Sequence, residues 1–106
     1  MTDERWERLA RNEAAFRALN VRVQDVTEEL AFDGVIGMPD VAECVCECAD
    51  PDCTTLLRVR RADYERARAR EATFIVALGH ELPEIERVVY DGDGFSIVEK
   101  DPSLPV

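Results

Sequence analysis

The four cysteines of this chain fall within ten residues, at positions 44, 46, 48 and 53. A chain of 106 residues is too short for two domains that each need a core, so we expect one folded unit that must accommodate all four thiols. Where thiols stay reduced, such a concentration is typical of metal binding, because thiolates and imidazole together suit Zn²⁺. The cluster therefore predicts a zinc site as the main constraint on the fold.

The spacing of the thiols predicts how they could meet. Residues 41–48 alternate in the way that places the first three cysteines on one face of a β-strand. An Asp-Pro-Asp turn follows, and residues 53–59 can return as the partner strand. In a strand Cys46 and Cys48 would be roughly 6.6 Å apart at the backbone, and Cys53 would approach from across the turn. One hairpin could therefore supply three metal ligands.

The fourth ligand is either His80 or Cys44. His80 is the only histidine of the chain and follows Gly79 at the end of a predicted strand; its alternative role is that of an exposed loop residue. We prefer His80, because a lone histidine beside a strand-ending glycine has no other evident task. Cys44 would then be a core residue or lie just outside the ligand shell, and it remains the alternative metal ligand.

Redox-active thiols, a disulfide and free buried cysteines are the alternatives to zinc. A bridge between Cys46 and Cys48 would be strained along an extended strand, whereas a bridge across the hairpin to Cys53 is easier. A structural zinc contributes about 10–16 kcal/mol, comparable with the roughly 5–15 kcal/mol stability of a whole domain. A shell filled by four protein ligands leaves no position for a reactive water, so an enzyme is not expected.

Residues 1–32 predict one long helix, since neither Gly nor Pro occurs before Gly34. Its apolar residues keep the spacing of a coiled coil. The stripe covers about four heptads, which is roughly 42 Å of helix, whereas a domain of this size has a radius of gyration of about 13 Å. Either the helix is broken, or it lies across its own domain, or its apolar stripe packs on a second copy or another protein. The last interpretation predicts a homodimer or partner interface formed by Leu9, Phe16, Leu19, Val23, Val26 and Leu30.

The segments after the cysteines predict one more helix and three more strands. Residues 61–72 are rich in Arg and predict a helix, with Tyr64 and Ala67 among its inward candidates. A short apolar run at 74–78 predicts a buried strand. The pattern that follows is the clearest one: two apolar runs, 88–90 and 95–98, flank an Asp-Gly-Asp-Gly turn and predict an antiparallel hairpin.

Together these segments predict an α+β fold in three regions. Residues 1–32 form the long N-terminal helix, which serves dimerisation or partner binding. Residues 41–100 form a zinc-stabilised α+β domain, in which the zinc-stapled hairpin and the C-terminal hairpin share one antiparallel sheet, with a short helix between them. Residues 101–106 form an irregular tail.

The net charge of −10 disfavours several classes of partner. It argues against broad binding to phosphate backbones and against attraction to anionic lipid. The chain contains no apolar run long enough to span a membrane, and its N-terminus does not resemble a signal peptide, so we expect a cytoplasmic protein. The one basic island, Arg58–Arg70, could contact nucleic acid, but a solvated face of arginines paired with acidic neighbours is the simpler interpretation.

No catalytic residues are predicted. The single histidine is assigned to the metal, and no Gly-rich phosphate loop occurs. The Asp91–Gly94 run is not a calcium loop, because Pro102 stands where the bidentate glutamate would be required. We therefore expect a zinc-stabilised, non-enzymatic interaction or adaptor protein in a regulatory context. The alternatives are a thiol-based redox switch that releases zinc, and a nucleic-acid-binding module that uses Arg58–Arg70.

The chain contains a set of short motifs that are specific when taken together. They are Asn12-Glu13, Phe16-Arg17, Asn20, 45–54, 62–65, Gly79-His80-Glu81, 83–89, 93–95 and Val98-Glu99-Lys100. The chain resembles a family of small actinobacterial proteins with a Cys-x-Cys-x4-Cys hairpin and a later Gly-His-Glu motif. The resemblance spans most of residues 12–100 and implies Cys46, Cys48, Cys53 and His80 as the shared positions, with an apolar aromatic residue in the place of Cys44. It implies no particular activity.

Overall fold

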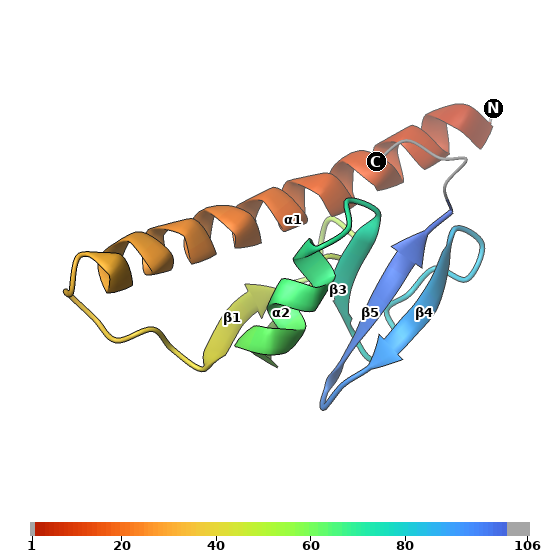
Figure 1. The fold of residues 1–106 in the computed structure, drawn as a ribbon. Coiled ribbons are helices and arrows are strands. Elements are labelled where there is room, and N and C mark those ends of the chain that lie inside the picture. The colour runs from red at the N-terminus through yellow and green to blue at the C-terminus, as the bar shows by residue number, and fades with distance from the viewer. Residues whose placement is uncertain (1, 102–106) are drawn as a thin grey trace.

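The structure, a computed structural model, describes residues 2–101, so the expected tail beyond Asp101 lies outside the described residues. It confirms the α+β fold with a long N-terminal helix. Figure 1 shows that helix running the length of the molecule, with the strands and the second helix on one side of it. The elements are α1 (Thr2–Phe32), β1 (Val41–Val45), β2 (Leu56–Arg60), α2 (Arg61–Arg68), β3 (Thr73–Ala77), β4 (Glu86–Asp91) and β5 (Phe95–Lys100).

Helix α1 is continuous over 31 residues. It ends where Gly34 adopts a positive φ of 78°. The Gly34 amide donates to the carbonyl of Ala31 (3.1 Å) and the Val35 amide to the carbonyl of Leu30 (2.9 Å). These two bonds define a Schellman C-cap, in which glycine tolerates the left-handed conformation and apolar side chains meet across the cap. The unbroken helix explains the elongated shape of 51 × 24 × 24 Å.

The face of α1 that lies on the domain is polar. It contains Glu13, Asn20 and Gln24, which are buried together with Ala10, and we call these four residues the docking face. The Asn20 side chain donates to the carbonyl of Val45 (2.8 Å) and accepts from the amide of the same residue (2.9 Å). Side-chain amides that bind the backbone of the neighbouring strand therefore fix the rotation of α1.

The apolar stripe of α1 lies beside the docking face and is only partly covered. The helix lies across its own domain, as one interpretation of the sequence predicted, but the stripe is not the face that it buries there. Leu9 and Phe16 are half-buried. The other four residues keep large exposed fractions: Leu19 48%, Val23 44%, Val26 46% and Leu30 38%.

Strands β1 and β2 form the expected hairpin, but β1 is shorter than predicted. Its register pairs Val41 with Arg60 and Val45 with Leu56. The prediction of one strand through residue 48 was wrong, because the backbone leaves extended pairing after Val45. There the Glu47 amide donates to the carbonyl of Ile75 in β3 (2.7 Å). The segment after β1 is therefore hydrogen-bonded to β3 and no longer continues the strand of the first hairpin.

The remaining strands form a separate sheet in the order β3-β5-β4, with both pairs antiparallel. The prediction that both hairpins share one sheet was therefore wrong. Helix α2 is also shorter than the predicted 61–72, although Tyr64 and Ala67 are buried as expected. The core between the two sheets and α2 includes Ala42, Cys44, Leu57, Val59, Tyr64, Ala67, Phe74, Ile75, Val76, Phe95, Ile97 and Val98.

A buried ionic cluster lies beneath the N-terminal half of α1. Glu13 and Lys100 are at most 1% exposed, and the Lys100 Nζ lies 3.1 Å from Glu13 Oε1. The same ammonium lies 4.9 Å from the ring centroid of Phe74. Burial and the neighbouring Glu13 carboxylate raise the pKa of Glu86 to about 9. Glu86 therefore keeps its proton at neutral pH and adds no negative charge to the cluster.

Candidate metal centre

Three sulfur atoms and one imidazole converge at the end of the first hairpin. The ligand atoms of Cys46, Cys48, Cys53 and His80 all lie within 4.8 Å of one another. The three cysteines lie within residues 46–53, whereas the histidine is residue 80. The tertiary fold therefore brings the histidine to the cysteines. Three thiols and one imidazole at this separation can hold a metal ion.

The hairpin loop holds its cysteines through a set of local bonds. The Cys46 amide donates to the carbonyl of Thr55 (3.0 Å), and the Cys53 amide donates to the carbonyl of Asp50 (3.1 Å). The Asp50 side chain accepts from the amide of Asp52 (2.9 Å). This Asx turn is typical of an Asp-Pro-Asp sequence. The loop therefore folds back so that Cys53 faces the two cysteines that precede the turn.

His80 reaches the cluster from the end of β3. Gly79 has a positive φ of 82°, which turns the chain directly after the strand. The His80 amide then donates to the carbonyl of Ala77 (3.0 Å). The Nδ1 atom of His80 lies 3.6 Å from the Sγ of Cys46 and 3.6 Å from the Sγ of Cys53. Nδ1 is therefore the ring atom that faces the sulfurs.

The site has a buried side and an accessible side. Cys46 and Cys48 are buried, Cys53 is half-buried and His80 is exposed. Burial raises the pKa of Cys46 to about 12 and also raises the pKa of Cys48. Burial alone would raise the pKa of Cys53 as well, but hydrogen bonds, first from Thr55, lower it to about 7. Without a cation the inner thiols therefore keep their protons, whereas a bound cation favours the thiolate form.

A backbone amide supports the inner sulfur. The Ala77 amide donates to the Sγ of Cys46 at 3.2 Å. Such N–H···S bonds stabilise a thiolate and orient it, in the way that groups around a metal site orient its ligands. Since Ala77 ends β3, one strand supplies both this donor and the position of His80.

Cys44 lies apart from the ligand group. It is 2% exposed on the inner side of β1 and belongs to the apolar core. Its Sγ lies 3.9 Å from the carbonyl of Ala42, and burial raises its pKa to about 12. All four cysteines are free thiols in the structure, with no disulfide among them. Cys44 therefore behaves as a small core side chain.

Glu47 is a structural residue that the sequence analysis missed. The expected alternation put it on the outer face of a strand, but it is 0% exposed. Its carboxylate accepts from Asn20 Nδ2 (2.6 Å), from Arg68 Nη2 (2.6 Å) and from the amide of Ile75 (3.0 Å). The sequence offered one indication of this role, because Glu47 stands between Cys46 and Cys48, two of the predicted metal ligands. Glu47 joins α1, α2 and β3 directly behind the metal centre.

The arginines of the Arg58–Arg70 island are largely engaged within the chain. This arrangement favours the ion-paired surface over the nucleic-acid surface, because paired guanidinium groups are less available to phosphates. The pairs are Arg60 with Asp63, Arg61 with Gln24, Arg66 with the ring of Tyr90, Arg68 with Glu47 and Arg70 with Glu99.

These observations define the class: an α+β protein with a Cys3His cluster that can hold a metal ion. Comparison with protein-family models, with curated proteins and with solved structures gives no match for this chain. Among the described residues, no helix combines the length and the apolar composition needed to cross a bilayer.

Proposed function

We propose that this chain is a zinc-stabilised, non-enzymatic interaction protein of the cytoplasm. The observation that carries the proposal is the convergence of Cys46, Cys48, Cys53 and His80 on one point. The proposal assigns two parts to the molecule. The metal centre would hold residues 41–100 in shape, and the exposed apolar side of α1 would contact a partner.

The donor set and its dimensions support zinc as the ion. Thiolates with imidazole favour Zn²⁺ over Mg²⁺ and Ca²⁺, which take oxygen ligands. In a tetrahedral zinc site with Zn–S about 2.3 Å and Zn–N about 2.0–2.1 Å, a sulfur and a nitrogen ligand lie about 3.6 Å apart. The distances from His80 Nδ1 to the Sγ atoms of Cys46 and Cys53 are both 3.6 Å. These two spacings therefore match those of a tetrahedral zinc site.

The filled ligand shell supports a structural role over a catalytic one. Hydrolytic zinc sites use three protein ligands and keep one position for water. Here the ligand atoms of four protein side chains lie within 4.8 Å of one another, and the backbone amide of Ala77 donates to the Sγ of Cys46. Such a site would stabilise the fold and activate no water.

Elemental analysis of the full chain, purified under reducing conditions, tests this proposal. We expect one zinc per chain. Cys53→Ser and His80→Ala should lose most of the metal, while Cys44→Ala should retain it as the matched control, because it removes a thiol that lies outside the ligand group. A metal-free protein, or equal metal loss in the Cys44 variant, would overturn the proposal.

A thiol-based redox switch is the second candidate, favoured by the accessible side of the site. Cys53 is half-buried and His80 is exposed, so an oxidant such as hydrogen peroxide can reach the outer ligands. Oxidation of two zinc-bound thiolates by one hydrogen peroxide would form one disulfide, consume two protons from solvent, yield two water molecules and release the Zn²⁺. Stoichiometric zinc release by mild peroxide, reversed by a thiol reductant, would support the switch. Retention of zinc under the same treatment would remove it.

A further inference from the structure

The exposed apolar residues of α1 form a short pattern with an unusual symmetry. Leu19, Val23, Val26 and Leu30, which we call the seam, are separated by four, three and four positions. The order Leu-Val-Val-Leu with this spacing is the same in both directions along the helix. An antiparallel helix from a second copy would therefore present Leu30 to Leu19 and Val26 to Val23, and the reverse.

The charges beside the seam follow the same symmetry. Arg22 and Glu29 are exposed and precede Val23 and Leu30, so they lie on the same edge of the seam, seven residues apart. In an antiparallel helix pair with the register given above, these positions face each other across the interface. Arg22 of one copy would meet Glu29 of the other, twice in each dimer. In a parallel pair, by contrast, residue 22 would face Thr27.

The surroundings leave room for a second helix at the seam. The docking face occupies a different side of α1, and the edge with Arg22 and Glu29 lies away from it. On the other edge, a groove of about 430 Å³ runs between α1 and the first hairpin, lined in part by Leu19, Val23 and Leu56. Leu56 is 77% exposed. Apolar surface therefore continues from the helix onto the hairpin.

The same register also covers apolar residues outside the helix. Val35 is 67% exposed, and its backbone amide donates a hydrogen bond to the carbonyl of Leu30 at the end of the seam. Because Leu30 of one copy would lie over Leu19 of the other, Val35 would approach the partner's groove near Leu56. One arrangement thus accounts for exposed apolar side chains in three segments of the chain.

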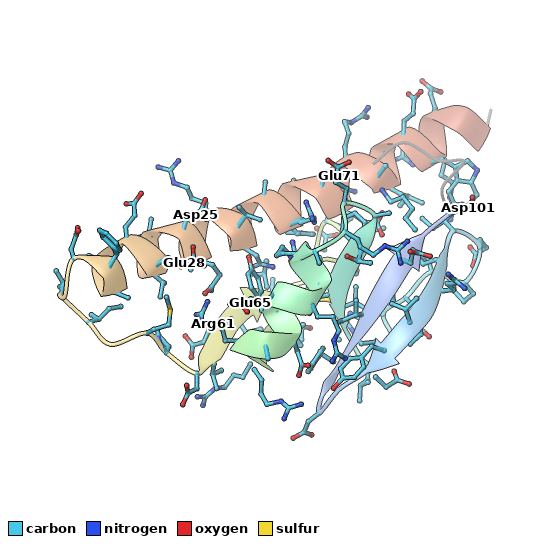
Figure 2. The ribbon with its side chains drawn as sticks, viewed as in Figure 1. Asp25, Glu28, Arg61, Glu65, Glu71 and Asp101 are labelled. Atoms are coloured by element: carbon cyan, nitrogen blue, oxygen red, sulfur yellow. The ribbon has the colours of Figure 1, made fainter. Side chains whose placement is uncertain are left out.

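We infer that the seam of α1 binds a second copy of this chain in an antiparallel, two-fold symmetric helix pair, with Arg22 opposite Glu29 of the partner. This inference rests on the proposed function only in taking α1 as the interaction element; it does not require zinc. A cationic partner helix is the competing occupant, because Asp25 and Glu28 lie on the part of α1 that extends beyond α2 (Figure 2). The seam's own charges are balanced, however, and match a second copy.

Sedimentation equilibrium of the full chain tests the inference. We expect reversible association in the micromolar range toward twice the monomer mass of 12.0 kDa. Val23→Asp and Val26→Asp should each weaken association at least about a hundredfold, since each places two carboxylates at the centre of the dimer. Circular dichroism would verify that both variants stay folded. A chain that stays monomeric at all micromolar concentrations would overturn the inference.

Charge reversal fixes the orientation of the pair. Arg22→Glu and Glu29→Arg should each weaken self-association about tenfold, because each converts two attractive pairs into two repulsive ones. The double variant should recover the parent affinity, and so should an equimolar mixture of the two single variants, in which both pairs are again opposite in sign. Glu28→Arg, an equal charge change off the edge of the seam, should leave the affinity unchanged.

The arms of this experiment separate the two proposals. If neither the double variant nor the mixture recovers affinity, the antiparallel register is wrong. If Arg22→Glu leaves self-association unchanged while Glu28→Arg weakens it, another surface forms the dimer. Zinc content measured on the same samples reports on the metal centre independently, so a zinc-loaded monomer overturns only the dimer, and a metal-free dimer overturns only the zinc site.

Discussion

Two regions of this molecule hold together segments that are distant in the sequence. The candidate metal centre joins the first hairpin to the loop after β3, and the docking face joins α1 to β1 and β5. At the candidate metal centre, three thiols from one hairpin and an imidazole from a distant loop lie close together, and the imidazole belongs to an exposed residue. At the docking face, buried amides and carboxylates each bind a separate backbone or charged group, as Asn20 does with Val45 and Glu13 does with Lys100.

The difference lies in how the stabilisation is distributed. A metal site concentrates it in one ion, so loss of any ligand removes most of it. The docking face spreads it over several hydrogen bonds, each worth about 0.5–1.5 kcal/mol, together with one buried ion pair. The metal centre should therefore fail as a unit, whereas the docking face should weaken stepwise.

Metal removal should have the largest effect. Because a structural zinc contributes about 10–16 kcal/mol, chelation should abolish cooperative unfolding of the domain and loosen α1, whose partner Val45 directly precedes Cys46. Thermal unfolding followed by circular dichroism, with and without chelator, measures this. Restoration of the transition by added zinc is the control, and an unchanged midpoint after verified metal loss would contradict the comparison.

Loss of the buried cation should have the next largest effect. Lys100→Met leaves the Glu13 carboxylate without its charge partner at 0% exposure, and such a loss costs about 3–5 kcal/mol. Denaturant unfolding of zinc-loaded protein measures it. The double variant Glu13→Gln with Lys100→Met should be less destabilised than Lys100→Met alone, because no uncompensated charge stays buried. A double variant no better than the single one would show that packing outweighs charge here.

Removing one docking side chain should cost less. Asn20→Ala removes three hydrogen bonds to Val45 and Glu47, and leaves the amide and carbonyl of half-buried Val45 without this partner. We expect a loss of about 1–3 kcal/mol with zinc content unchanged. Val26→Ala, on the exposed side of the same helix, is the matched control and should change stability by less than about 0.5 kcal/mol in dilute protein. If the two changes lower the free energy of unfolding equally, the hydrogen bonds of the docking face do not stabilise the attachment of α1.

Counted over a single pH unit, the smallest expected effect is the pH dependence of stability that comes from Glu86. Its folded-state pKa of about 9 lies above the ordinary value of 4.5, so the folded protein binds the proton more tightly. Stability from this group is complete below the ordinary pKa and declines as pH rises toward about 9, by at most about 1.4 kcal/mol per pH unit. Glu86→Gln should flatten this part of the profile in zinc-loaded protein. An unchanged slope in that variant would assign the pH dependence elsewhere.

The sequence predicted the elements more accurately than their arrangement. The absence of Gly and Pro before Gly34 gives the length of α1, and the Asp-Gly-Asp-Gly turn gives the last hairpin. The error in the length of the first strand has a visible cause. The alternation through residue 48 resembles a strand, but Glu47 turns inward to bind Asn20, Arg68 and Ile75. A buried ionic contact among distant segments overrides the local pattern there.

Local chemistry thus determined which residues of this protein could hold a metal, where α1 ends and where the turns lie, because turn residues, helix breakers and thiol spacing act over a few positions. Only the tertiary structure decided which face of α1 is buried. Periodicity identifies an apolar stripe but not the surface opposite it. In this molecule the surface opposite is strand backbone, which binds Asn20 and Gln24 more specifically than it would bind Leu19 and Val23.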